Sequence, residues 1–188
     1  MNLAQEYHDR LIDLARGTIR AALGGTEFPA PPEDDLVLQQ RAGCFVSLHR
    51  AHDHRLRGCV GRLDAKLSLG EIVCTMALGV LEDPRFLTDP VRFEELPELH
   101  IELSILSPLR AMASPLDFDL LNEGIYLTHA GRSGCFLPQV ARETQWDKEQ
   151  LLARLCAEKM GIPAIAWRHA ETRAFSFTTL IIGPRLLG

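Results

Sequence analysis

Leu56-Arg57-Gly58-Cys59-Val60-Gly61 is the stretch of this chain that says most about its fold. Successive side chains of a β-strand point to opposite faces. In an extended conformation Arg57 and Cys59 therefore share one face, while the apolar residues Leu56 and Val60 share the other. The two glycines remove bulk beside them, so a ligand or another backbone can approach closely. The stretch predicts an amphipathic strand that carries a site.

The polar face of this strand pairs a guanidinium with a thiol. A cation beside a cysteine favours the thiolate, the form that attacks electrophiles and binds metals. We expect Arg57, Gly58, Cys59 and Gly61 to contact a ligand or a partner in an accessible crevice. Cys59 is also the candidate catalytic nucleophile.

A hairpin is predicted around this strand. Residues 43–49 and 55–60 alternate apolar with polar side chains, and a short polar loop joins them. The shortest loop sets a register with three opposite pairs: His49 with Arg55, Ser47 with Arg57, and Phe45 with Cys59. In that register His49 lies about 13 Å along the strand from the partner of Cys59, too far to act as its base.

The remaining elements favour an α+β fold. Helices are predicted over residues 3–23, over 69–80 after a Ser68/Glu71 capping box, and from residue 148 after Asp147. Further strands are predicted over 99–106, 124–128, 134–137 and 172–182. This order lacks the regular alternation of a doubly wound sheet, so we expect a largely antiparallel sheet flanked by helices.

The hexapeptide and several later blocks resemble the AMMECR-type domain family. Blocks similar to those of the family follow one another in the same order: Gly43-Cys44-Phe45-Val46-Ser47-Leu48, Asp83-Pro84-Arg85-Phe86, Glu95-Leu96, Ile101-Glu102-Leu103-Ser104-Ile105-Leu106, Glu123-Gly124-Ile125, Leu137-Pro138-Gln139-Val140 and Trp146-Asp147. The resemblance covers residues 3 to about 182. It implies a larger and a smaller subdomain with a groove between them, lined by the hexapeptide. We expect one AMMECR-type domain over residues 1–188, with room for two interleaved subdomains.

The same resemblance implies partners without implying a reaction. Bacterial and archaeal members resemble component A of the AmmeMemoRadiSam gene grouping. A Memo-type protein, itself similar to ring-cleaving dioxygenases, and a radical S-adenosylmethionine enzyme accompany it there. Family context therefore favours an accessory component of a shared pathway, and it names no cofactor.

Two residues outside the hexapeptide are added to the candidate site. Arg85 follows the rigid turn Asp83-Pro84 and could reach an anionic group, although a helix stop explains the turn equally well. Beside Arg57 it would make the groove attractive to a small carboxylate or phosphate. Gln139 could present its amide to a ligand or tie down a strand exit.

Composition limits the other classes of function. The 188 residues carry a net charge of −5, and the Lys and Arg residues are scattered, which argues against a nucleic-acid partner. No apolar run approaches a membrane span, and the charged residues near the N-terminus exclude a secretory segment, so we expect a cytoplasmic protein. The five widely spaced cysteines predict neither a disulfide framework nor a cysteine zinc site.

A histidine cluster lies at the hairpin tip. His49, His52 and His54, with Asp53 among them, offer ligands that suit zinc, iron or copper. The spacing matches no structural metal site, and a hairpin tip is normally solvated, so we expect no metal there. Two functions stay open: a module that binds a partner or a small anion, and a thiol-dependent enzyme that uses Cys59 with Arg57 in an anion-binding groove.

Overall fold

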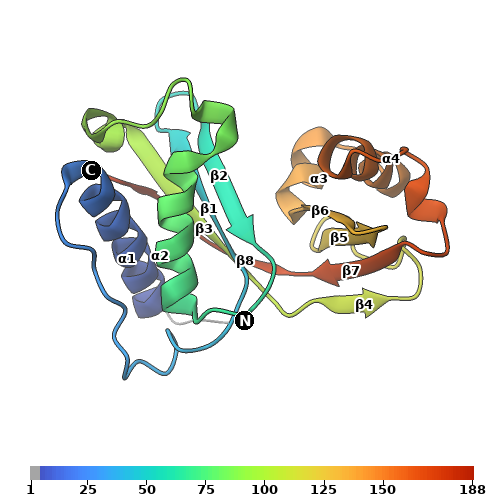
Figure 1. Ribbon diagram of the computed structural model, residues 1–188, viewed down its shortest axis with the longest axis horizontal. Coiled ribbons are helices and arrows are strands. Elements are labelled where there is room, and N and C mark those ends of the chain that lie inside the picture. Colours follow the sequence, from blue (N-terminus) through green and yellow to red (C-terminus); the bar gives the residue numbers. More distant parts are fainter. Residues whose placement is uncertain (1–4) are drawn as a thin grey trace. The chain divides into compact units, whose positions relative to one another are not determined.

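The computed structural model describes residues 5–188 and divides them into two compact units. The first unit comprises the chain as far as Leu106 and then Leu180–Gly188, and the second is Ser107–Thr179. Each unit has its own four-stranded sheet and its own helices (Figure 1). The α+β prediction is confirmed, with two antiparallel sheets in place of the single one expected.

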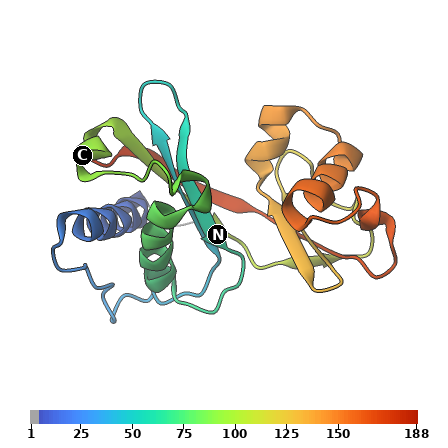
Figure 2. The same ribbon diagram turned by 45° about the horizontal axis from the view of Figure 1, so that its top comes forward.

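The sheet of the first unit has the strand order β2-β1-β3-β8. Its strands are β1 (Cys44–Arg50), β2 (Leu56–Arg62), β3 (Leu99–Leu106) and β8 (Thr179–Leu186). Helices α1 (Gln5–Gly24) and α2 (Leu69–Gly79) lie side by side against one face of this sheet (Figures 1 and 2). The strand β2, which carries the hexapeptide, comes first in the strand order and is an edge strand of this sheet.

The helices cover the apolar face of the sheet. Cys44, Val46 and Leu48 of β1 are fully buried there, as are Ile101 and Leu103 of β3. The helix α2 begins at the predicted capping box, in which Ser68 accepts a hydrogen bond from the Glu71 amide and the Glu71 carboxylate accepts one from the Ser68 amide. The face with Phe45, Ser47 and the other alternate residues is turned away from α1 and α2.

The predicted hairpin register is wrong by two residues. Ser47 lies opposite Cys59 and Phe45 opposite Gly61, while His49 pairs with Leu56 after a bulge. From Gly58 onward the two-residue shift keeps the side chains on their predicted faces, whereas at the tip the shift is one residue and Leu56 lies opposite His49. The tip accounts for one residue of the error, because the Arg50 amide bonds to the Arg55 carbonyl and His54 adopts a left-handed conformation with φ of 57°. The extra residue at the bulge accounts for the other.

Three short 3-10 helices connect α2 to β3. They are η1 (Val80–Glu82), η2 (Pro84–Phe86) and η3 (Phe93–Glu98). The predicted stop at Asp83-Pro84 is confirmed, since Asp83 caps η2 through its side chain. This connection passes along the β2 edge and reaches the hexapeptide, as the contacts below show.

The sheet of the second unit has the order β4-β7-β5-β6. Its strands are β4 (Arg110–Met112), β5 (Gly124–His129), β6 (Arg132–Phe136) and β7 (Arg173–Phe177). The helices of this unit are α3 (Pro138–Thr144), α4 (Lys148–Arg154), the π-helical turn η4 (Leu155–Met160) and η5 (Ala166–Arg168). Its core joins strand residues such as Ile125 and Leu127 to Leu152 and Leu155.

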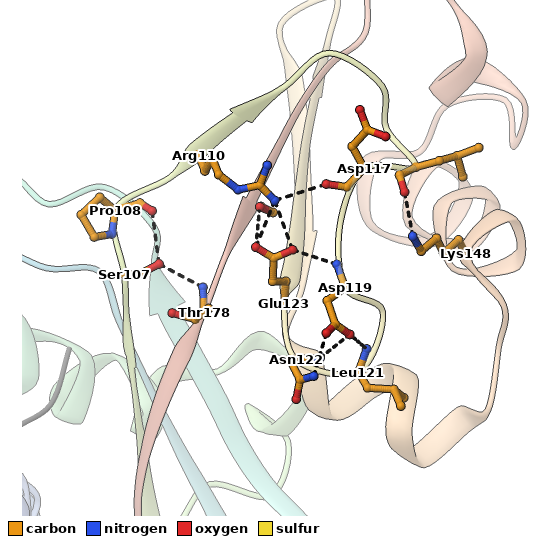
Figure 3. Close-up of polar contacts among 12 residues, drawn as sticks. Ser107, Pro108, Arg110, Asp117, Asp119, Leu121, Asn122, Glu123, Lys148 and Thr178 are labelled. Atoms are coloured by element: carbon orange, nitrogen blue, oxygen red, sulfur yellow. Dashed lines mark hydrogen bonds and ion pairs between the residues drawn. The ribbon is translucent and has the colours of Figure 1, made fainter.

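A partly buried carboxylate organises the end of this second sheet (Figure 3). Glu123 accepts hydrogen bonds from the Arg110 guanidinium of β4, the Ser176 hydroxyl of β7 and the Asp119 amide. It therefore joins both strands to the loop before β5. Only 19% of its side chain is exposed, although a charged residue at the end of a strand ordinarily faces solvent.

The predicted strand over 172–182 is two strands in different sheets, β7 and β8. The chain leaves β7 at Thr178, whose amide bonds to the Ser107 hydroxyl and whose carbonyl accepts the Ser107 amide (Figure 3). The predicted helix over 3–23 corresponds to α1, and its first residues, 3 and 4, lie outside the described part of the chain. Within residues 5–188 no helix is long and apolar enough to span a bilayer.

Candidate functional site

Arg57 points into the first unit and is already bound. Its side chain is 3% exposed and forms a fork with Glu95, in which Nη2 lies 2.9 Å and Nε 3.2 Å from Oε2. Nη1 donates to the Asp89 carbonyl oxygen at 2.9 Å and to the Asp89 carboxylate at 3.2 Å. The guanidinium carbon lies 5.8 Å from the centre of the Phe86 ring. These contacts satisfy a buried charge.

The expectation that Arg57 projects beside Cys59 into an accessible crevice is therefore wrong. The bulge explains it, since the extra residue of the hairpin lies on β2 between Leu56 and Gly58 and breaks the alternation at Arg57. The β1–β3 register is continuous through the same region, so β1 itself is regular. Two carboxylates already surround Arg57, so it offers no positive field to a further anion.

Close packing requires both glycines of the hexapeptide. A Cβ on Gly58 would lie 2.7 Å from the Val80 carbonyl oxygen, where α2 ends against the strand. A Cβ on Gly61 would lie 2.1 Å from Cγ of Phe45, whose ring covers the glycine on the other face. The predicted close approach is real, and the approaching groups are parts of the same unit.

The main chain of Cys59 is held by the turn after α2. Its amide donates to Asp83 Oδ2 at 2.8 Å, and its carbonyl oxygen accepts from Arg85 Nη2 at 3.1 Å. Asp83 and Arg85 also bind each other, with Nη2 2.6 Å from Oδ2 and Nε 3.0 Å from Oδ1. The turn thus satisfies the open edge of β2 at Cys59.

Charge around Cys59 comes from Arg85 instead of Arg57. The hydrogen bonds from Arg85 lower the pKa of Asp83 to about 2, against the opposing effect of burial. The pKa of Arg85 is raised chiefly by Asp83, and an ionised Cys59 adds to the rise, which places the guanidinium and the thiol in electrostatic contact. About half of the Arg85 side chain is exposed, and Cys59 is half-buried.

The second face of the sheet gathers polar residues from three strands. Ser47 lies between Cys59 of β2 and Glu102 of β3, and the three form one row across the sheet. In the next row His49 of β1 lies opposite His100 of β3. All five residues are partly exposed, unlike their neighbours on the helix-covered face. This polar face, defined by Cys59, Ser47, Glu102, His49 and His100, is the candidate site.

Gln139 belongs to the second unit. It is the second residue of α3, after Leu137 at the N-cap position and Pro138 at the first helical position. The predicted strand exit at 137–140 is therefore a helix start. Gln139 therefore lies in the helical layer of the second unit, while Cys59 and Arg85 lie in the first unit.

The histidines predicted as a cluster are spread around the hairpin tip. His54 stacks on His100 with ring centroids 6.4 Å apart, and His52 Nε2 lies 3.4 Å from Asp53 Oδ2. In the described part of the chain, no three His, Cys, Asp or Glu side chains are placed to hold a metal ion.

Sequence reasoning missed the residues that other elements bring to the hexapeptide. Glu102 and His100 lie on the same face of the sheet as Cys59 because β3 pairs with β1. This pairing joins residues more than 50 positions apart in the sequence. The alternation of apolar residues within 99–106 already predicted that these two side chains lie on the polar face of a strand. The sequence did not show that β1 is the neighbour of this strand. Glu95 and Asp83 lie in two of the blocks that resemble the family, but no local pattern indicated that they bind Arg57 and Cys59, which lie 38 and 24 residues away in the sequence.

Comparison with known proteins agrees with this architecture. The family model AMMECR1 matches residues 12–182. A Thermoplasma volcanium protein designated TV1384 is 31% identical over 97% of this chain and 92% of its own length. A Methanothermobacter thermautotrophicus protein is 34% identical over 95% of both chains. The crystal structure of the uncharacterized protein PH0010 from Pyrococcus horikoshii superposes with a TM-score of 0.87 at 32% identity and covers 95% of this chain and 92% of that one. The chain belongs to the AMMECR1 family.

Proposed function

We propose that this protein is an accessory component that binds a partner or a small anionic ligand through the polar face and the neighbouring Arg85. The partners are the Memo-type protein and the radical S-adenosylmethionine enzyme that family resemblance implies. The protein would deliver a small anionic ligand to one of these enzymes or bind the enzyme itself.

One observation supports the proposal. Of the four predicted hexapeptide site residues, three are held by contacts inside the first unit, and only the side chain of the fourth, Cys59, lies partly exposed on the surface. Arg57, Gly58 and Gly61 are fixed by internal contacts. The main chain of Cys59 is clamped by Asp83 and Arg85, which leaves its partly exposed side chain on a rigid strand. Rigid presentation of a few polar groups is typical of recognition sites.

Arg85 supplies the charge for such recognition. Its Nε and Nη2 are occupied by Asp83 and by the Cys59 carbonyl, and its Nη1 makes no hydrogen bond to another described residue. This nitrogen is available to a carboxylate or phosphate. The neighbouring Asp83 weakens the positive field, so recognition would depend on direct contact more than on long-range attraction.

A binding experiment with the two neighbouring gene products tests this function. Each purified partner is titrated with the wild-type protein and with Arg85→Ala, Cys59→Ser and Arg92→Ala, and the heat of binding is measured. Arg92 is an exposed arginine of the same unit with no ion pair to another described residue, so it serves as the matched control. We expect Arg85→Ala to weaken binding at least tenfold and Arg92→Ala to leave it unchanged. If neither partner binds the wild-type protein, the accessory function is wrong.

A second function, a thiol-dependent enzyme, is favoured by the corrected register. The predicted register placed His49 about 13 Å along the strand from the partner of Cys59. In the structure that partner is Ser47, which shares the strand β1 with His49 and lies two residues from it. The distance along the strand falls to about 7 Å, so the objection that Cys59 lacks a base no longer holds.

A further inference from the structure

We propose that Cys59, His49 and Glu102 form a nucleophile, base and orienting carboxylate on the polar face. This inference rests on the second function above and assigns its residues. The three side chains come from three neighbouring strands: Cys59 from the edge strand β2, His49 from the central strand β1 and Glu102 from β3.

The register places His49 diagonally next to both other residues. Ser47 lies directly opposite Cys59 on one side and directly opposite Glu102 on the other. His49 is two residues farther along β1 on the same face, since β1 pairs with β3 without a break. Diagonal neighbours in a sheet have Cβ atoms about 7–8 Å apart, a gap that an imidazole can bridge toward a thiol or a carboxylate.

This in-line order suits proton transfer better than metal binding. A metal ion needs its ligands to converge on one point, and the described residues contain no such group of three. A proton relay needs only two contacts, thiol to imidazole and imidazole to carboxylate. The same order of roles is found in thiol hydrolases on unrelated folds.

Charged and titratable groups surround this set on every neighbouring element. The groups that face it are His100 on β3, His54 stacked on His100, and Asp83 with Arg85 at the β2 edge. Glu102 favours an imidazolium at His49, and Arg85 favours a thiolate at Cys59. Asp83, the ionised partner of Arg85, weakens the effect of Arg85 on the thiol, so the contact between His49 and Glu102 is the main support for a thiolate–imidazolium pair.

The reaction class that fits this set is acyl transfer. His49 holds the thiol proton in the ion pair, and the sulfur forms a bond to the carbonyl carbon of the acyl group while the carbonyl π electrons move to the oxygen. When the tetrahedral intermediate collapses, the bond to the leaving amine or alkoxide breaks and His49 returns the proton to it. Water, with its proton accepted by His49, then hydrolyses the thioester and restores the thiol. An anionic group on the acyl compound would contact Arg85.

Alkylation of Cys59 by iodoacetamide as a function of pH tests the set without any substrate. Burial raises the pKa of Cys44, Cys74 and Cys156, so these thiols react slowly, and Cys135→Ser removes the remaining one. The rate at Cys59 is measured by peptide mass spectrometry from pH 5 to pH 9. We expect appreciable reaction at pH 6, and His49→Asn should slow it roughly ten- to hundredfold at that pH. Glu102→Gln should slow it by a smaller factor.

His52→Asn is the matched control, because it removes an imidazole from the same hairpin at its exposed tip, where His52 Nε2 lies 3.4 Å from Asp53 Oδ2 and outside the polar face. We expect its profile to stay within about twofold of the parent rate. An unchanged profile in His49→Asn overturns the proposal. A loss of reactivity in a His100→Asn variant, with His49→Asn unchanged, would show that His100 is the base instead. Partner binding by His49→Asn is measured in parallel, so a failed relay is distinguished from a failed accessory function.

Acyl transfer is tested with p-nitrophenyl acetate as the acyl probe. We expect a burst of one p-nitrophenolate per chain and an acetylated Cys59 in the wild-type protein, both reduced at least tenfold in His49→Asn. An acetyl group that is found on other residues while Cys59 stays unmodified overturns the reaction class.

Discussion

Replacing Arg57 tests whether the hexapeptide arginine is a structural residue. The Arg57→Ala variant loses the fork to Glu95, the two contacts to Asp89 and the stack on Phe86. Removing one member of a buried ion pair costs about 3–5 kcal/mol. Glu95 is 30% exposed and Asp89 65% exposed, so water can solvate the carboxylates that remain. We therefore expect the lower end, about 3 kcal/mol.

The variant Arg57→Met separates charge from packing. Methionine keeps most of the apolar stem and removes the guanidinium, so we expect a loss of about 2 kcal/mol. For a chain of this size, 3 kcal/mol corresponds to a fall in Tm of about 6–12 °C. Arg92→Ala, the exposed control, should change the free energy of unfolding by less than about 0.5 kcal/mol.

Far-ultraviolet circular dichroism is the appropriate measurement, because α1 and α2 of the first unit contribute to it. Both tryptophans, Trp146 and Trp167, lie in the second unit, so their fluorescence reports the other half of the molecule. We expect the dichroism transition of Arg57→Ala to move by at least as much as the fluorescence transition. A dichroism midpoint within about 2 °C of the wild type would refute the structural reading of Arg57.

Three further predictions concern the groups around the hexapeptide. Gly58→Ala should lower the free energy of unfolding by about 2–3 kcal/mol, because the new Cβ would lie 2.7 Å from a main-chain oxygen. Gly79→Ala places its Cβ 3.3 Å from a Val60 methyl group and should leave the free energy of unfolding unchanged or raise it by up to about 1 kcal/mol. Urea titration of both variants measures the difference. Asp83 has a folded pKa of about 2 against an ordinary 3.8, so it contributes about 2 kcal/mol of stability that is present above pH 4 and lost as the pH falls through 2. The stability difference between the wild type and Asp83→Asn should therefore shrink between pH 4 and pH 2, and a constant difference would contradict this assignment. Cys59→Ser should change stability by less than about 0.5 kcal/mol, as thermal melting can show, because the thiol is half-buried and its main-chain contacts remain.

Local sequence signals predicted most of the elements. The capping boxes at Ser68 and Asp147 located two helix starts, since each satisfies main-chain amides within one turn. The alternation in 99–106 identified β3. The break at Thr178 was missed, because the residues on both sides keep the same alternating pattern while they belong to different sheets. The three-residue strand β4 was also missed, since it is too short to show a period.

The candidate site was predicted only in part. The faces of β1, and of β2 from Gly58 onward, were predicted correctly, because side-chain alternation survives a shift of two residues. The burial and ion pairing of Arg57 were not predicted, because its partners Glu95 and Asp89 lie more than 30 residues away in the sequence. Arg85, and not Arg57, contacts Cys59. Residue type alone could not predict this, because both arginines lie near the cysteine and only tertiary contacts decide which one is buried.

The insertion of the second unit between β3 and β8 has a consequence for biosynthesis. Ser107–Thr179 is continuous and can begin to fold as it leaves the ribosome, whereas the first sheet lacks its last strand until Leu180–Gly188 emerges. The edge of β3 is therefore unpaired during this interval, and exposed strand edges bind other chains. Nascent or truncated protein that ends before β8 is the form most prone to aggregate.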